Sequence, residues 1–382
     1  MMRLLPRISV LFETAVRMAL HDRMKLAGAL LGVVFATFLG GQQLGIFLGL
    51  VQKNTLLADG VQADIWIAPK NTQQAEASTT LPERSVFLAR TTPGVAWADP
   101  LLFQTGTLVT ENGTAEPVRI LGFDASTGRG GPWNVTAGDP ALLRNPGTLF
   151  LDTIDRKRHG GTNLGSIREV MGHQMQVVGF TSGLQPFGPT FAFTDFNQAL
   201  RLFSRTDRNP HFVLVGVEPS ADTAAVVAAL QASLPDADVM TGAEYHDRIV
   251  NYLLTETQIG VSFGTSTMFG LIVGFVIVGL TMFSGVVDNL REFGMLKAIG
   301  ATTFDLALVL MLQAAGYAIA GSGIGLLLVG GLAAGIRSPA LVVILPPWLI
   351  FGAPVLMLTV CISASFLALL RIRGLEPAMV FR

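Results

Sequence analysis

Four stretches of this chain are almost entirely apolar, and each is long enough to cross a membrane. A helix of roughly 20 residues spans the hydrocarbon core of a bilayer. The pattern predicts transmembrane helices at residues 26–51, 261–287, 304–335 and 348–370. The first apolar stretch is longer than that of a secretory signal, which runs about 7 to 15 residues. No small-x-small cleavage site follows it cleanly, so we interpret it as an uncleaved anchor.

Basic residues near the ends of the spans predict the orientation, because Lys and Arg stay preferentially on the cytoplasmic side. They gather before the first span, between the second and third, and after the fourth: Arg3, Arg7, Arg17, Arg23, Lys25, Arg291, Lys297, Arg371, Arg373 and Arg382. The short loop 336–347 offers only Arg337. We therefore expect segments 1–25, 288–303 and 371–382 in the cytoplasm, and segment 52–260 in the periplasm.

Segment 52–260 has a sequence pattern typical of a compact α+β domain, with short β-like runs, turn residues and helical runs between them. The strands we predict are 64–68, 118–123, 175–180 and 212–218, and the helices are 82–90, 195–203, 222–234 and 244–257. Asp195 and Asp222 are expected helix N-caps. The last helix runs almost without a breaker into the second span, which predicts a continuous stalk. The alternative is a hinge near Gly260 or Gly264.

The fold class predicted is thus an α-helical membrane protein with four transmembrane helices and a large α+β periplasmic domain inserted between the first and second. Segment 1–25 adds a helix on the cytoplasmic interface, since residues 11–26 have a short amphipathic pattern. A plain solvated tail is the alternative reading of that segment.

Glycines recur four apart in the first two spans, at Gly41, Gly45, Gly49, Gly270 and Gly274. Such a stripe allows two helix backbones to approach closely in lipid. These positions are our candidates for a homodimer contact. Glycine is common in transmembrane helices in any case, so a packing role without a dimer stays open.

The composition excludes several functions. Half of the residues are hydrophobic, 14% are charged and the net charge is −1, which gives no basis for nucleic-acid binding. The single cysteine and five scattered histidines provide no metal-ligand spacing. No charged residue lies in the middle of a span, which disfavours a proton-coupled carrier. We find no catalytic motif. The dipeptide Gly-Lys of a P-loop never occurs, so ATP must bind another chain if it powers this one.

The predicted cytoplasmic loop contains the run Asp-Asn-Leu-Arg-Glu-Phe-Gly-Met-Leu-Lys-Ala-Ile-Gly-Ala-Thr at residues 288–302. Apolar residues recur at spacing three, at Leu290, Phe293, Leu296 and Ile299, which predicts a short amphipathic helix with one face for a groove on a partner. This run resembles the signature of FtsX/MacB-type ABC transporter permeases. The resemblance implies a coupling helix formed by Arg291, Glu292, Phe293, Gly294, Met295, Leu296, Lys297, Ala298, Ile299 and Gly300.

Weaker similarities to the DevC-like branch follow in order along the chain, at residues 63–66, 149–152, 177–180, 187–188 and 376–382. The resemblance implies a homodimer of permeases in the bacterial inner membrane, paired with separate cytoplasmic ABC ATPases that bind ATP and Mg²⁺. This chain itself would bind no cofactor or metal. It also implies export by mechanotransmission, with a periplasmic adaptor and an outer-membrane channel.

DevC-type permeases are associated with lipid or glycolipid export, which makes membrane lipid an expected partner. No residue of the sequence can be tied to a particular cargo. The alternative is a non-transporting, FtsX-like signalling permease that activates a periplasmic partner.

Overall fold

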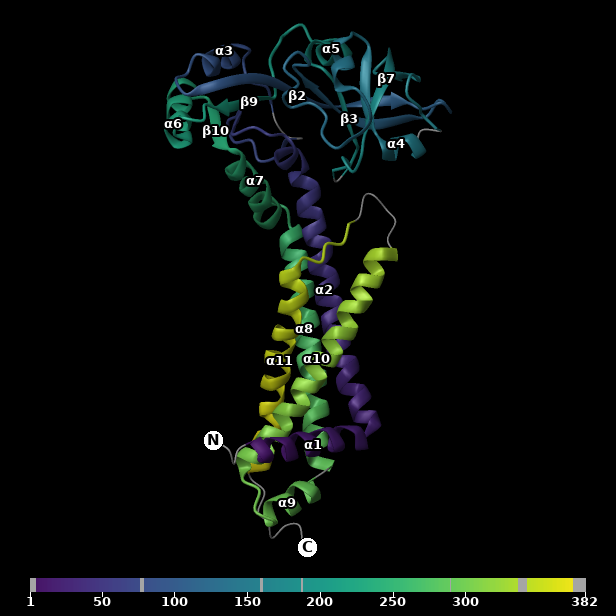
Figure 1. Cartoon of the computed structure of the whole chain (residues 1–382), viewed down its shortest axis with the longest axis vertical. Coiled ribbons are helices and arrows are strands. Elements are labelled where there is room, and N and C mark those ends of the chain that lie inside the picture. The colour runs from purple at the N-terminus through teal and green to yellow at the C-terminus, as the bar shows by residue number, and fades with distance from the viewer. Residues whose placement is uncertain are drawn as a thin grey trace. The chain divides into compact units, whose positions relative to one another are not determined.

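The computed structural model describes residues 5–75, 79–158, 161–186, 188–288, 290–335 and 342–373. The chain divides into two compact units (Figure 1). We call the first the helical unit; it contains the described residues up to Gly49 and from Gly260 onward. The second, the α+β unit, contains residues 50–259.

The helical unit is built from long apolar helices. Among the described residues, four helices are long and apolar enough to span a membrane. Their bounds are Arg23–Gly60 for α2, Ile259–Asp288 for α8, Thr303–Gly335 for α10 and Pro347–Arg373 for α11. Each contains, or nearly coincides with, a predicted span. The largest difference is α2, which continues beyond the predicted end at residue 51 into the α+β unit.

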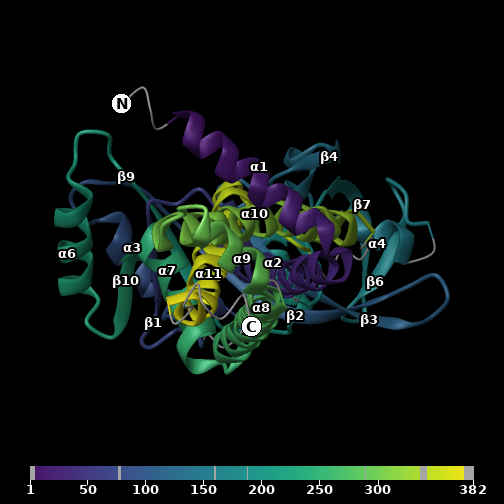
Figure 2. The ribbon, with the colours of Figure 1, turned by 90° about the horizontal axis from the view of Figure 1, so that it is seen from below.

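Two shorter helices complete the helical unit. The amphipathic helix α1 (Leu5–His21) lies crosswise to the long helices, as Figures 1 and 2 show from two directions. It starts and ends earlier than the predicted helix 11–26, because the chain turns at Asp22 before α2 begins. The second short helix, α9 (Leu290–Ala298), lies between α8 and α10 in the sequence.

Small residues let the long helices pack closely around α2. A Cβ atom added to Gly32 would lie 2.5 Å from Ile277, and one added to Gly321 would lie 2.6 Å from Val33. Both distances are too short for real atoms, so α8 and α10 approach α2 at positions where no larger side chain fits. The sole cysteine, Cys361 of α11, is fully buried in the same core, as expected for a packing residue.

The α+β unit contains one ten-stranded sheet, with the strand order β10-β1-β9-β2-β3-β8-β5-β7-β4 and β6 paired with both β2 and β7. The strands are β1 (Ile65–Pro69), β2 (Val95–Val109), β3 (Ala115–Phe123), β4 (Val135–Gly138), β5 (Thr148–Asp152), β6 (Ile167–Val170), β7 (His173–Thr181), β8 (Phe191–Asp195), β9 (Phe212–Val217) and β10 (Ala237–Thr241). The four predicted strands correspond to β1, β3, β7 and β9.

Helices cover the sheet near its two ends. They are α3 (Arg84–Arg90), the 3₁₀ helix η2 (Pro140–Arg144), α4 (Thr153–Arg158), α5 (Phe196–Leu202), α6 (Thr223–Ser233) and α7 (Gly242–Asn251). Asp195 accepts hydrogen bonds from the amides of Asn197 and Gln198, and Asp222 accepts one from Ala224. Both predicted N-caps are therefore confirmed.

The long strand β2 joins two halves of the sheet. Its first part pairs with β9, and its second part pairs with β3. One apolar core gathers around β1, β9, α3 and α6, and another around β3, β5, β7, β8 and α5. The unit thus has two subdomains that share one strand.

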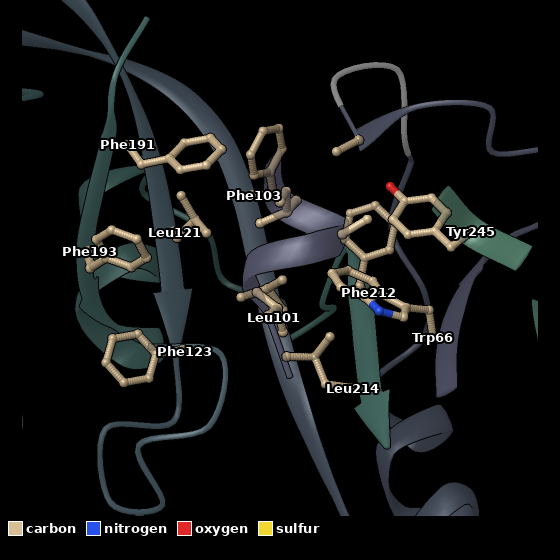
Figure 3. Close-up of a cluster of buried hydrophobic side chains, with 14 of the residues drawn as sticks. Trp66, Leu101, Phe103, Leu121, Phe123, Phe191, Phe193, Phe212, Leu214 and Tyr245 are labelled. Atoms are coloured by element: carbon tan, nitrogen blue, oxygen red, sulfur yellow. The ribbon is translucent and has the colours of Figure 1, made fainter. Parts of the chain in front are cut away.

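A third core, rich in aromatic residues, connects α7 to the sheet (Figure 3). The ring of Trp66 lies 4.9 Å from that of Tyr245 on α7 and 5.5 Å from that of Phe212 on β9. Such tilted and edge-on contacts add to the stabilisation from burial alone. Helix α7 is therefore firmly held on the β1–β9 side of the sheet.

The predicted continuous stalk is interrupted. Helix α7 ends at Asn251 and is followed by a π-helical turn, η3 (Tyr252–Glu256), and by an extended Thr257, before α8 begins at Ile259. The Thr257 hydroxyl donates to the carbonyl of Leu253, and the Thr257 amide donates to that of Tyr252. Such local bonds compete with the regular helical ladder. The break lies ahead of Gly260 and Gly264, the two hinge positions considered from the sequence.

Replacing Phe212 by alanine should destabilise the α+β unit by about 3–5 kcal/mol, because this ring is fully buried. The thermal midpoint of the whole chain, followed by tryptophan fluorescence in detergent, should fall by roughly 6–20 °C. The control is Phe87→Ala, since Phe87 is 56% exposed. Equal midpoints for the two variants would contradict the assignment of Phe212 to the core.

Candidate coupling site

Helix α9 exposes a pair of apolar side chains. Met295 is 45% exposed and Ile299, directly after the helix, is 85% exposed. Residues four apart lie on the same side of a helix, so these two form one small apolar surface. Gly294 is buried, and Leu296 packs against the core of the helical unit.

The structure thus changes the predicted apolar face. Leu296 turns towards the protein's own core, so Met295 takes its place beside Ile299 on the exposed surface. Among the other predicted coupling residues, Glu292 and Lys297 are half-buried, whereas Ala298 and Gly300 are exposed. The side chains of Leu290, Arg291 and Phe293 lie outside the described residues. The role of all these residues in coupling stays a prediction.

The turn after α9 is fixed by two local signals. Gly300 has a φ of +110°, a conformation that glycine adopts without strain, and its amide donates to the carbonyl of Lys297. Thr302 and Asp305 then form a reciprocal cap, in which each side chain accepts a hydrogen bond from the other residue's backbone amide. The sequence Gly-Ala-Thr therefore ends one helix and starts the next.

A charged cluster joins α8 to the corner between α1 and α2. The Lys25 ammonium lies 2.7 Å from a carboxylate oxygen of Asp22 and 2.9 Å from one of Asp288, the last residue of α8. The Ser284 hydroxyl donates to Asp288 over 3.1 Å. The hydrogen bond from Lys25 also lowers the pKa of Asp22. We call Asp22, Lys25 and Asp288 the ionic cluster.

Asp288 of the ionic cluster is the first residue of the predicted coupling loop 288–303. A second polar contact nearby is the hydrogen bond of 3.2 Å from the Gln313 side chain of α10 to the carbonyl of Ala15 on α1. Together these contacts tie α1, α2, α8 and α10 to one another beside α9. Sequence reasoning missed the ionic cluster, whose only signal was a pair of opposite charges at the starts and ends of apolar stretches.

The glycines proposed as a dimer face all meet atoms of the same chain. An added Cβ would lie 3.3 Å from Val329 at Gly41, 2.8 Å from Val343 at Gly45 and 3.5 Å from Leu39 at Gly270. At Gly49 and Gly274 it would overlap Val342 and Ala36. The close approach that these glycines permit is therefore within one chain, and the homodimer contact stays a prediction.

The fold and the coupling loop define the class of protein, and comparison with known families agrees. The family model "MacB-like periplasmic core domain" matches residues 26–233, and the model "FtsX-like permease C-terminal" matches residues 264–377. The chain belongs to the MacB/FtsX family of ABC transporter permeases. Its α+β unit is the MacB-like periplasmic domain, inserted between the first and second of four membrane-spanning helices, which confirms the predicted fold class and an inner-membrane location.

Individual relatives are distant in sequence. Two ABC transporter permeases of Mycobacterium tuberculosis, from strains CDC 1551 / Oshkosh and ATCC 25618 / H37Rv, are 26% identical over 312 residues, which is 79% of this chain and 80% of each relative. The periplasmic region of MacB from Actinobacillus actinomycetemcomitans is a structural neighbour with a TM-score of 0.41 and 12% identity, covering 50% of this chain and 95% of that structure. The extracellular domain of the transporter YknZ from Gram-positive bacteria has a TM-score of 0.35 and 14% identity, and the match covers 47% of this chain and 98% of that structure.

Removing the Lys25 ammonium should loosen the helical unit. In Lys25→Met the carboxylates of Asp22 and Asp288 lose their common partner, which should weaken the contact between α2 and α8. Because Cys361 is the only cysteine and is fully buried, its rate of modification by a thiol reagent in mild detergent reports on opening of this core. We expect that rate to rise, by less than about tenfold, as is typical of losing a partly exposed ion pair.

The control is Lys25→Arg, which keeps the positive charge and should keep the slow modification of Cys361. A double-mutant cycle with Asp288→Asn isolates the interaction between Lys25 and Asp288. If the effects of the two substitutions on Cys361 modification are additive, the two residues do not interact. Identical Cys361 reactivity in Lys25→Met and the unmodified protein would contradict a stabilising role for the ionic cluster.

Proposed function

We propose that this protein is the permease subunit of an ABC exporter that transmits ATPase motion to its periplasmic domain. The observation that carries the proposal is the chain connection: one helix, α8, leads from the coupling helix α9 to η3 and α7. Helix α7 in turn is anchored on the sheet by the contact of Tyr245 with Trp66. A displacement of α9 therefore has a path along the chain, through α8, the break at Thr257, η3 and α7, to the α+β unit.

The other proposed components of the transporter follow from membership of the permease family. ABC transporter permeases work with an ATPase, so membership implies a cytoplasmic ATPase partner, on which ATP and Mg²⁺ would bind. We further propose that two copies of this chain pair, and that a lipid, glycolipid or other hydrophobic cargo leaves through a periplasmic adaptor and an outer-membrane channel. The support for a hydrophobic cargo is the lack of charged residues in the middle of the spans.

The exposed pair on α9 is where we expect the ATPase to dock. Ile299→Asp places a charge on this apolar surface. It should weaken binding of the ATPase subunit, measured by co-purification, at least tenfold, which corresponds to about 1.4 kcal/mol of binding free energy. Because Ile299 is exposed, the variant should fold normally. The conservative variant Ile299→Leu is the control. Undiminished co-purification with Ile299→Asp would show that α9 is not the docking element.

Transmission through the broken stalk can be tested separately from docking. Two glycines inserted between Thr257 and Gln258 should leave ATPase co-purification unchanged and uncouple α7 from α8. In the unmodified complex, ATP binding should change amide hydrogen exchange in α7. With the insertion, amide hydrogen exchange in α7 should be the same with and without ATP.

A matched control inserts two glycines beside Gly113, in the exposed turn between β2 and β3. That variant should respond to ATP like the unmodified complex. An unaltered response in the stalk insertion would overturn mechanotransmission through α8. A response without any accompanying cargo export would favour the signalling alternative.

A further inference from the structure

The helical unit contains an apolar cavity that none of its own side chains fills. It has a volume of about 250 Å³ and lies between α2, α8 and α11. Its hollow shape results from small residues on two facing helices, which include Gly40 and Gly41 on α2 and Gly352 and Ala353 on α11. An added Cβ at Gly352 would meet no atom within 4 Å, so this glycine borders open space.

The wall of the cavity has almost no polar character. No charged side chain contributes to it, and its only hydroxyl groups are those of Thr37 and Thr267. Thr267 already donates to the carbonyl of Phe263. Thr37, only 3% exposed, has a hydroxyl without a hydrogen-bond partner among the described residues. Apart from these two hydroxyl groups, the only other polar side-chain group among the described lining residues is the indole N–H of Trp348 at one end, so a polar ligand would lose its hydration on entry and find few partners for its hydrogen bonds.

The position of the cavity along the helices fits one leaflet of a bilayer. Trp348 lies at one end of the α11 wall and Met357 at the other, nine helical steps away, or about 14 Å. That length is about half of the hydrocarbon thickness of a membrane. Trp348 is 58% exposed, as is typical of tryptophan at the membrane surface.

The end with Trp348 is also the end nearer the periplasmic domain in the chain. The Ile344 amide, just before α11, donates to the carbonyl of Gly45 on α2. From Gly45, helix α2 continues directly towards the α+β unit, which begins at Leu50. The Trp348 end of the cavity is therefore the end from which α2 continues into the MacB-like periplasmic domain, and we expect this end at the periplasmic surface of the membrane and the Met357 end near its middle.

We propose that this cavity is a binding site for one acyl chain of a phospholipid from the periplasmic leaflet. The chain enters beside Trp348 and Leu44 and reaches Met357, while the polar headgroup stays at the surface. A lipid acyl chain matches the wall in polarity, length and direction, and the bilayer supplies it wherever these helices are embedded. The inference does not require the bound lipid to be the cargo, so it stands independently of the exporter proposal.

Lipid photocrosslinking, combined with a variant that fills the cavity, tests the proposed acyl-chain site. The full-length protein is reconstituted in phosphatidylcholine nanodiscs with a phosphatidylcholine probe that carries a diazirine halfway along one acyl chain. After illumination, mass spectrometry locates the adducts. In the unmodified protein, adducts on residues 36–44 and 348–357 should saturate as the probe fraction rises, whereas labelling of the lipid-facing side of α10 should rise linearly.

Gly352→Leu places a side chain in the open space of the cavity and should lower the saturable adducts at least fivefold. Gly331→Leu is the matched control, because Gly331 also borders open space in a membrane-spanning helix but does not line the cavity. This control should label like the unmodified protein. Unchanged adducts in Gly352→Leu, or linear labelling of the wall, would overturn the proposal.

A second copy of the chain is the competing occupant, since Gly41 also belongs to the predicted dimer face. Gly352→Cys in a Cys361→Ala background resolves this point. If oxidation in nanodiscs yields a disulfide-linked dimer in high yield, a second copy covers the cavity and the acyl-chain site is wrong. A protein that stays monomeric on oxidation, together with saturable lipid adducts, supports the site.

Discussion

Close packing around α2 is the constraint on which the rest of the structure depends. Inside a membrane, apolar side chains gain nothing by leaving lipid for protein, so helices associate through tight contact between small residues. Here Gly32, Gly274 and Gly321 let α8 and α10 approach α2 where any larger residue would clash. Helix α2 is also the one that continues into the α+β unit, where Leu57 and Ala58 enter the aromatic core. Its position therefore affects both units.

The ionic cluster complements this packing in a different environment. Lys25 and Asp288 lie at ends of apolar helices, where charges can still be hydrated in part, and they join two helices that are far apart in sequence. Apolar contacts set how closely the helices approach, and the cluster adds a directional contact beside the coupling loop. The cavity next to Gly352 shows the opposite situation, because small residues on facing helices there leave space that the chain does not fill.

Features that depend on neighbouring residues were predictable from the sequence, and features that depend on distant pairing were not. The spans and the caps at Asp195 and Asp222 follow from local patterns of apolar and capping residues. Strand β2 was not predicted at all, because Pro100 interrupts its pattern, although this strand pairs on both sides. The break at Thr257 lies just before Gly260, one of the two hinge positions considered, but its place was not predictable, because threonine is a permitted helix residue and only its hydrogen bonds reveal the interruption.

For the predicted coupling site, the sequence did not show which side chains of the loop face outward. Spacing alone grouped Leu296 with Ile299, whereas packing of α9 against the neighbouring helices turns Leu296 inward and leaves Met295 exposed. Lys25 and Asp288 are 263 positions apart, so no local pattern could pair them.

The shared strand β2 limits how the two subdomains of the α+β unit can move relative to each other. Because the two subdomains have this strand in common, they cannot tilt independently without breaking its ladders to β9 and β3. Because β6 pairs with both β2 and β7, the edge strand β4 lies six strand steps from β10, which is at most about 29 Å at about 4.8 Å per step. Under the proposed mechanism, a tilt of about 10° applied by α7 near β10 would displace β4 by at most about 5 Å on this spacing. A small change of angle at the stalk would thus become a displacement comparable to one strand spacing at the opposite edge of the sheet.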